Sequence, residues 1–275
     1  MVFCNGKVQD DGVSESIGFL LIFTIVIVGI GLVTLYGYPL LLKQQVSADE
    51  QIMEKNMIVL QNDMKSLAYK MVPYKETSLK TGGGTLYVYN SMVTPPSSTI
   101  SITDCDGVTH VGSFHSGDLR YVSQSAGTDI SLQNGAVVKR DRIGRGSVML
   151  AEPRWFSDPV TNTMVINLIA INSSDVMARS GIATIQMELG QSNYTYIPVG
   201  VGEDVCVDYT PDTNPDENER ADFSTAWHNY FTSRLPMVKV SPAGVTPIEY
   251  QVVKPDPAKD FTLVIKKYEI IIKSL

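Results

Sequence analysis

The sequence predicts an α+β protein in which a long N-terminal transmembrane and stalk helix precedes an antiparallel β-sandwich-like domain that contains one short aromatic helix. Residues 16–42 form a stretch of 27 residues without Asp, Glu, Lys or Arg, and 19 of them are apolar. Apolar side chains then recur at helical spacing as far as Met71. From Thr85 onward the pattern changes to short alternating or β-branched runs, which are typical of strands.

Composition excludes several classes of protein. The chain has 275 residues and a formal net charge of -7. All of its formal charges lie outside residues 16–42, so the rest of the chain has the charge density of an ordinary globular domain. A multi-span membrane protein, a collagen-like chain and a wholly disordered chain are therefore excluded, and the negative charge argues against nucleic acid as a partner.

Residues 17–42 are long enough to cross a bilayer. As a helix they measure about 39 Å, against a hydrocarbon core of about 30 Å. A buried core helix seldom runs this far without a charge. A cleaved secretory signal is also disfavoured, because Lys7 is outnumbered by Asp10, Asp11 and Glu15 and because the run is longer than a signal-peptide apolar region. We expect a single-pass membrane segment.

The stalk that follows has an apolar stripe with heptad spacing. Two interpretations are open: the stripe packs on the protein's own globular domain, or it packs against the same helix of neighbouring subunits. No strong breaker lies between Pro39 and Pro73, so a nearly continuous helix is expected, kinked or locally melted near Gly37 and Pro39. The stripe consists of Met53, Met57, Leu60, Met64, Leu67 and Met71.

A β-rich domain is expected over residues 80–275. Its strand-like runs are separated by Gly, Pro, Asp and Ser, as in antiparallel sandwiches. The runs lie at residues 85–93, 99–105, 108–114, 119–124, 136–140, 147–152, 163–171, 182–189, 194–201 and 205–209.

Two further features lie in the C-terminal part of this domain. From Asp222 to Pro236, bulky side chains recur at helical spacing, which predicts a helix packed into the core. In the last strand the apolar alternation changes phase at Lys266 and Lys267, which predicts a bulge or break there. The bulky side chains of the helix are Phe223, Trp227, Tyr230, Phe231 and Leu235.

Residues 12–19 read GVSESIGF and lead into the long apolar run. This N-terminus resembles that of archaeal type IV pilin-like and archaellin-like surface proteins, and most closely an uncharacterised pilin-like group with the pattern V-S-E-x-x-G-F. Residues 133–138 (QNGAVV) and 148–153 (VMLAEP) also resemble that group. The resemblance implies a hydrophilic leader over residues 1–12, removed by a prepilin peptidase between Gly12 and Val13. The leader usually has Lys or Arg before the glycine, whereas Asp10 and Asp11 stand here, so an uncleaved anchor remains the alternative.

The resemblance also implies how such a chain would work. Residues 13–73 would form the transmembrane and stalk helix, and the β-rich domain would be extracellular. The protein would be a structural subunit of a type IV pilus-like filament, with the membrane, the pilus assembly machinery and copies of itself as partners. Glu15 at the apolar end of the helix would be neutralised by the freed amine of Val13 in an adjacent subunit. The alternative is a single-pass surface protein whose β domain binds a ligand or glycan without polymerising.

Cysteine usage fits an external domain. Removal of the leader would take away Cys4 and leave Cys105 and Cys206, which predicts a disulfide between them. Two buried free thiols are the alternative.

One motif has the alternating oxygen ligands of a calcium loop: Asp212, Asn214, Asp216 and Asn218. It lacks the Gly and the distal Glu of an EF-hand, so a solvated acidic loop is the competing interpretation. With three histidines, no glycine-rich phosphate loop, no serine elbow and no paired-acid signature, we expect neither catalysis nor a cofactor.

Two surface features complete the expectations. A basic hairpin with Lys139, Arg140, Arg142 and Arg145 is predicted to meet the acidic stretch at residues 203–222 of another subunit. Asn172 and Asn193 each begin an N-x-[ST] sequon, which makes both of them glycosylation candidates on an external domain.

Overall fold

The computed structural model describes residues 11–92, 98–144, 146–212 and 222–275, with side chains described from Ser16 onward. The chain divides into two compact units, Met1–Ala48 and Asp49–Leu275. One long apolar helix and a mostly antiparallel β domain are present, as the sequence predicts.

The first unit is helical throughout its described part. Helix α1 (Asp11–Leu32) passes into a π-helical segment, η1 (Val33–Gly37), and then into α2 (Tyr38–Lys70). Pro39 has no N–H, and its ring would clash with the carbonyl four residues earlier in a regular α-helix. The Tyr38 N–H donates to the Val33 carbonyl in a widened turn. The helix is therefore not melted near Pro39; it forms a π-bulge there and stays continuous.

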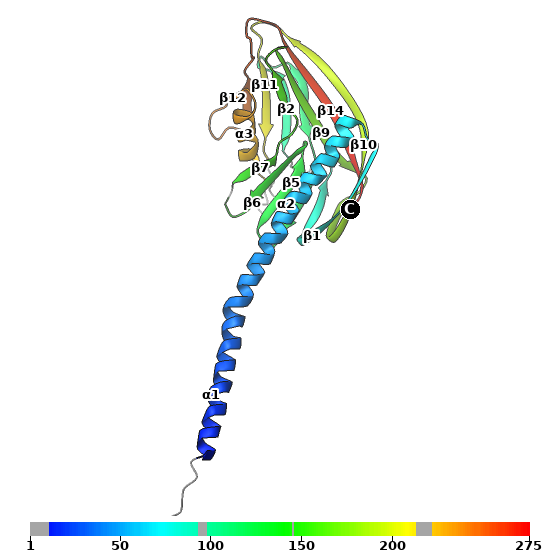
Figure 1. Cartoon of the computed structure of the whole chain (residues 1–275). Coiled ribbons are helices and arrows are strands. Elements are labelled where there is room, and N and C mark those ends of the chain that lie inside the picture. The colour runs from blue at the N-terminus through cyan, green and yellow to red at the C-terminus, as the bar shows by residue number, and fades with distance from the viewer. Residues whose placement is uncertain (1–10, 93–97, 145, 213–221) are drawn as a thin grey trace, which may run out of the picture. The chain divides into compact units, whose positions relative to one another are not determined.

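The second unit contains two sheets (Figure 1). The large sheet has the strand order β7-β6-β5-β4-β1-β10-β14-β9-β8, and the small sheet has the order β12-β13-β11-β2-β3. Every pairing is antiparallel except that of β14 with β9. The large sheet comprises β7 (Ser147–Ala151), β6 (Ala136–Asp141), β5 (Thr128–Gln133), β4 (Asp118–Ser123), β1 (Tyr74–Tyr89), β10 (Met177–Val199), β14 (Phe261–Ser274), β9 (Thr163–Ser173) and β8 (Phe156–Asp158). The small sheet comprises β12 (Met237–Lys239), β13 (Ile248–Val252), β11 (Val205–Thr210), β2 (Thr99–Asp104) and β3 (Thr109–His115), and helix α3 spans Ser224–Ser233.

The large sheet has a hydrophobic core on each face, and a different layer covers each core. One face packs on the small sheet and α3 and forms the inter-sheet core, which includes Ile102, Val207, Trp227, Phe231, Tyr250 and Leu263. The other face packs on α2 and forms the helix–sheet core, which includes Met57, Leu60, Leu86, Leu132, Ile169 and Ile270. The domain therefore has three layers, with the large sheet in the middle.

Strand β14 contributes to both cores. Phe261, Leu263 and Ile265 belong to the inter-sheet core, whereas Ile270 and Ile272 belong to the helix–sheet core. Neighbouring side chains of a strand point to opposite faces of the sheet. The apolar positions therefore shift by one residue at the point where β14 stops contributing to the inter-sheet core and begins to contribute to the helix–sheet core, an exchange of cores along one strand.

This exchange explains the phase change at Lys266 and Lys267. The predicted break there is wrong, because β14 pairs with β9 without interruption from Thr262 to Ile272. A register shift lies instead in the partner strand β10, between Leu189 and Ser192.

Several strands differ from the sequence-based expectation. Strand β1 already begins at Tyr74, before the glycines. Along its first half, exposed residues alternate with partly or fully buried ones. Residues 182–189 and 194–201 belong to one long strand, β10. Strand β5 was not predicted, since only Ile130 and Leu132 in it are apolar. The aromatic helix is present as α3, and its five predicted core residues are all buried in the inter-sheet core.

Candidate functional site

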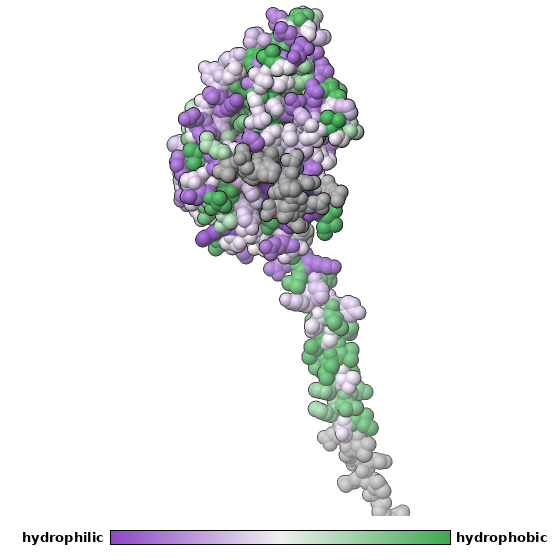
Figure 2. Space-filling model, turned by 180° about the vertical axis from the view of Figure 1, so that it is seen from behind, coloured by the Kyte–Doolittle hydropathy of each residue, from purple (hydrophilic) through white to green (hydrophobic). Residues whose placement is uncertain are grey.

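The anchor segment, residues 17–42, presents apolar side chains that nothing else in the described chain covers. Phe19 is 73% exposed and Leu35 is 70% exposed. Figure 2 shows hydrophobic side chains along this helix. In the described residues, one helix, Ser16–Lys70, is long and apolar enough to cross a membrane, and none of its most apolar window is buried. The anchor segment is therefore suited to anchor the chain in a membrane.

The two threonine hydroxyls of the anchor segment are also compatible with lipid. The Thr24 hydroxyl donates to the Leu20 carbonyl at 2.7 Å, and the Thr34 hydroxyl donates to the Ile30 carbonyl at 2.9 Å. These bonds satisfy both hydroxyl donors within the helix itself, which matters where no water is available.

The apolar stripe of α2 packs on the protein's own domain. Met53, Met57, Leu60, Met64 and Leu67 all have an exposed fraction of 0% and lie in the helix–sheet core. Of the two interpretations of the stripe, packing against a neighbouring helix is wrong for these five residues, because their side chains already touch the large sheet. Contacts between copies of the chain would have to use other residues.

Met71 departs from the stripe. The helix ends at Lys70, and Met71 adopts the left-handed conformation with φ 53°. The Val72 N–H then donates back to the Ser66 carbonyl at 3.4 Å across the end of the helix. Met71 is 69% exposed and contributes a helix stop instead of a core contact.

Gln61 is a buried polar residue within the helix–sheet layer, and the sequence pattern did not reveal its role. Its side-chain amide donates to the Gly135 carbonyl at 2.7 Å and to the Glu152 carbonyl at 2.9 Å. The turn between β5 and β6 is also held from the other side, because the Asn134 side-chain oxygen accepts from the Ile169 N–H at 2.9 Å. Two segments that carry the pilin-like resemblance, residues 133–138 and 148–153, thus meet at Gln61.

The basic hairpin is paired within the chain, so three of its charges already have partners, and its contact with the acidic stretch of another subunit stays a prediction. Lys139 Nζ lies 2.9 Å from Glu50 and 2.6 Å from Glu54 on α2. Arg140 and Arg142 both contact Asp129, at 2.6 Å and 2.9 Å. Strand pairing of β5 with β6 brings these charges together, which spacing along the chain could not show. Arg145 and residues 213–221 of the acidic stretch lie outside the described residues.

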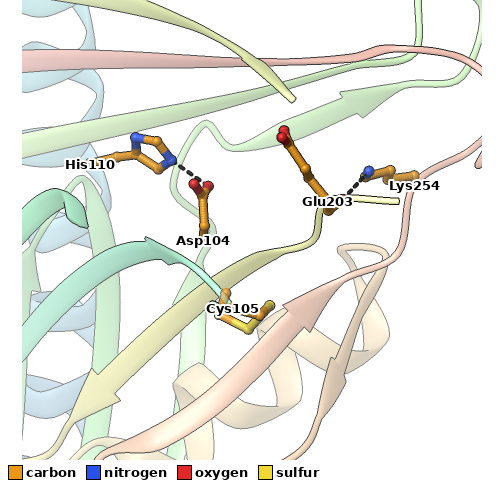
Figure 3. Close-up of a disulfide and its surroundings, with 6 residues drawn as sticks. Asp104, Cys105, His110, Glu203 and Lys254 are labelled. Carbon is orange, nitrogen blue, oxygen red and sulfur yellow. Dashed lines mark hydrogen bonds and ion pairs between the residues drawn. A yellow bond between two sulfur atoms is a disulfide. The ribbon is translucent and has the colours of Figure 1, made fainter. Parts of the chain in front are cut away.

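The structure joins Cys105 to Cys206 in a disulfide (Figure 3), with an S–S distance of 2.11 Å. The bond connects the loop after β2 to β11, beside the Cys105 N–H that donates to the Asp204 carbonyl at 3.0 Å. Glu249 approaches the two sulfur atoms, but the disulfide uses both sulfurs, so the three residues do not form a metal site.

Two polar contacts flank the disulfide (Figure 3). His110 Nε2 lies 2.5 Å from Asp104 Oδ1, which ties β3 to the end of β2. The Lys254 ammonium donates to the Gly200 carbonyl at 3.0 Å and to the Glu203 carbonyl. This end of the small sheet is therefore held covalently and by charge-assisted hydrogen bonds.

Comparison with known proteins identifies a family. A model described as "Family of unknown function (DUF7289)" matches residues 12–240. The chain belongs to this family. No curated protein and no solved structure matches it significantly.

The family match includes both the anchor segment and most of the β domain. It begins at Gly12, one of the two residues of the expected processing site, and Gly12, Val13 and Glu15 lie in α1. The side chains of Val13 and Glu15 are outside the described residues, so their expected roles in processing and assembly stay predictions.

The calcium motif also lies mostly outside the described residues. Asn214, Asp216 and Asn218 are not described, and Asp212 is 7% exposed. The calcium interpretation and the acidic-loop interpretation both stay predictions.

The two sequons differ in accessibility. Asn172 is buried, its amide nitrogen donates to Glu269 at 2.5 Å, and its side-chain oxygen accepts from the Ser91 hydroxyl. Glycan attachment would need this nitrogen, so the expectation for Asn172 is wrong in the folded domain. Asn193 is exposed on β10, so its glycosylation stays a prediction.

Proposed function

We propose that the chain is a structural, pilin-like subunit of an archaeal cell-surface filament. In this proposal the anchor segment holds the chain in the membrane, the β domain lies outside the cell, and subunits assemble through their anchor segments. Lipid around the apolar helix would be replaced by the same helix of neighbouring subunits.

One observation carries the proposal. The helix has two parts with different uses: the stripe from Met53 to Leu67 is covered by the protein's own large sheet, while the anchor segment has no apolar partner among the described residues. An apolar surface of this length needs lipid or other helices around it, because water would leave it unfavourably solvated. The resemblance of residues 12–19 to pilin N-termini supports the choice of other helices as the second partner.

The alternative function is an uncleaved, single-pass surface protein that binds a ligand or glycan. Asp10 and Asp11 favour it, because they stand where pilin leaders usually carry Lys or Arg. The two functions share the anchor and differ in processing and polymerisation.

Mass spectrometry of the mature N-terminus from native membranes tests the proposal. A chain that begins at Val13 supports it, and a chain that keeps Met1 or begins at Val2 contradicts it. A variant Gly12→Leu should block processing, whereas Gly112→Ala on β3 should be processed normally, because an added Cβ at Gly112 meets no atom within 4 Å.

Electron microscopy of material sheared from the cell surface tests the assembly step. Filaments that contain this chain are expected from wild-type cells and from Gly112→Ala cells, and none from Gly12→Leu cells. Processed chains that remain dispersed in the membrane would contradict polymerisation while leaving the anchor intact.

A further inference from the structure

A groove with a volume of about 990 Å³ lies between the last turns of α2, the segment after β7 and the end of α3. Four basic side chains line it: Lys65, Lys70, Arg154 and Arg234. Glu152 is the one acidic residue in its described lining. We call this feature the basic groove. Its positive sign is opposite to that of the whole chain, which has a net charge of -7.

Most of this charge has no carboxylate partner. Glu152 forms an ion pair with Arg234 at 2.8 Å. Within the described part of the chain, Lys65, Lys70 and Arg154 form no ion pair, unlike Lys139, which contacts two carboxylates at once. Three cations therefore share one groove without a carboxylate partner of their own, although the charge of Glu152 acts on Lys65 from nearby.

Neutral groups hold two of these cations in place. The Lys65 ammonium donates to the Glu152 backbone carbonyl at 3.2 Å, and the Arg154 guanidinium lies over the Tyr69 ring, 4.9 Å from its centroid. Burial and the nearby Arg154 charge lower the pKa of Lys65. A bound anion would relieve both effects, since it would replace lost hydration and offset the repulsion between the two cations.

Helix ends account for only part of the positive charge. Helix α2 ends at Lys70, and Arg234 caps the C-terminal end of α3, so both residues complement helix dipoles. Each helix C-terminus carries about half a negative charge. Together with Glu152 they leave an excess of roughly two positive charges in the groove.

We propose that the basic groove binds a ligand with at least two closely spaced phosphate groups. An arginine fork and lysine ammonium groups match phosphate oxygens in geometry and charge. A single carboxylate would leave part of the excess charge unneutralised, whereas two phosphates would neutralise it. The volume is in the range of small-ligand sites. Two sources supply this chemistry: a soluble polyphosphorylated molecule, or a cluster of phospholipid headgroups.

The test uses the full chain in a neutral detergent and measures the binding of inorganic tripolyphosphate by isothermal titration calorimetry at low salt. We expect saturable binding that weakens as salt is added. The double variant Lys65→Gln/Arg154→Gln should weaken binding by about tenfold or more. The control Lys80→Gln/Arg179→Gln removes the same charge at two exposed positions outside the groove and should change affinity by less than about twofold.

A further variant separates loss of the site from loss of the fold. Lys65→Arg keeps the charge and should retain binding, and all variants should keep the wild-type near-UV circular dichroism. No saturable binding, or equal losses in the groove and control variants, would overturn the proposal. Competition with short-chain phosphatidic acid, and with short-chain phosphatidylcholine as control, then assigns the source. Displacement by phosphatidic acid alone indicates a lipid headgroup, and no displacement indicates a soluble ligand. The outcome does not depend on whether the chain polymerises.

Discussion

The Gln61 side chain donates a 2.7 Å hydrogen bond to the carbonyl of Gly135, 74 residues later in the chain. The same amide group reaches the Glu152 carbonyl at 2.9 Å, so one residue of α2 connects the β5–β6 turn with the end of β7. A polar residue in the middle of an apolar stripe thus sets how the helix docks on the sheet, because each buried carbonyl needs a donor.

Removal of this amide should destabilise the domain. Gln61→Met keeps the volume of the side chain but removes the side-chain donor of the buried Gly135 carbonyl and one of the two side-chain donors of the Glu152 carbonyl, and we expect a loss of about 2 kcal/mol in the free energy of unfolding. Chemical denaturation of the full chain in detergent, followed by near-UV circular dichroism, measures it. The neighbouring exposed Asn62→Ala should change stability by less than about 0.5 kcal/mol. Equal effects of the two changes would show that Gln61 is not a docking residue.

Truncation of the apolar stripe should affect the isolated subunit. Leu60→Ala removes a fully buried side chain and should cost about 2 to 4 kcal/mol of stability in the unassembled protein. The adjacent Val59→Ala, at a position that is 49% exposed, serves as the control and should cost much less. If Leu60→Ala left the monomer's thermal midpoint unchanged, the stripe would have to act between subunits.

Replacement of the helix-stop residue should stabilise the protein. Met71 adopts φ 53°, a conformation that glycine adopts without steric cost. Met71→Gly should therefore raise the free energy of unfolding by about 1 kcal/mol. Met92→Gly, at another exposed methionine without a left-handed backbone, should give no gain. A lower thermal midpoint for Met71→Gly would contradict this account.

Reduction of the disulfide should destabilise the β domain. The bond closes a loop with a sequence separation of 101 residues, and its loss should cost about 2 to 5 kcal/mol. Thermal melts with and without dithiothreitol measure the effect, and the variant Cys105→Ser/Cys206→Ser should not respond to the reductant.

A thiol titration of the unreduced, denatured protein adds a test of processing. The chain has three cysteines, of which the disulfide uses two. A processed chain should therefore show no free thiol, and a chain that keeps Cys4 should show one. Free thiols in a chain that begins at Val13, up to two per chain, would instead show that the disulfide is incomplete.

Stability should depend on pH through Asp208. Burial, together with the facing Glu249 charge, raises the pKa of Asp208 above its ordinary value of 3.8. The folded state thus binds the proton of the Asp208 carboxyl more tightly than the unfolded state does. The ionised Asp208 therefore lowers the free energy of unfolding at neutral pH, and this loss disappears as the pH falls through the pKa of Asp208 in the folded state. Asp208→Asn should stabilise the domain at pH 7 by about 0.5 kcal/mol. The gain in stability should disappear below pH 3.8, where the wild type and the variant are both neutral at residue 208. A gain that is the same at pH 7 and below pH 3.8 would contradict the electrostatic cause.

Features that depend on local patterns could be predicted from the sequence. An uncharged apolar run predicts the anchor segment, the spacing of four and three residues predicts the buried face of α2, and the aromatic residues from Phe223 to Leu235 predict α3. Each of these predictions rests on the composition or the spacing of residues within one segment of the chain.

The surface that each pattern packs against became known from the fold alone. The stripe of α2 could be covered by its own sheet or by a neighbour, and the phase change in β14 could mean a break or an exchange of cores. The charges of Lys139, Arg140 and Arg142 looked free in the sequence, yet their partners on α2 and β5 come from distant positions. Burial and ion pairing depend on which segments the fold brings together, and periodicity along one segment carries no information about the segment that faces it.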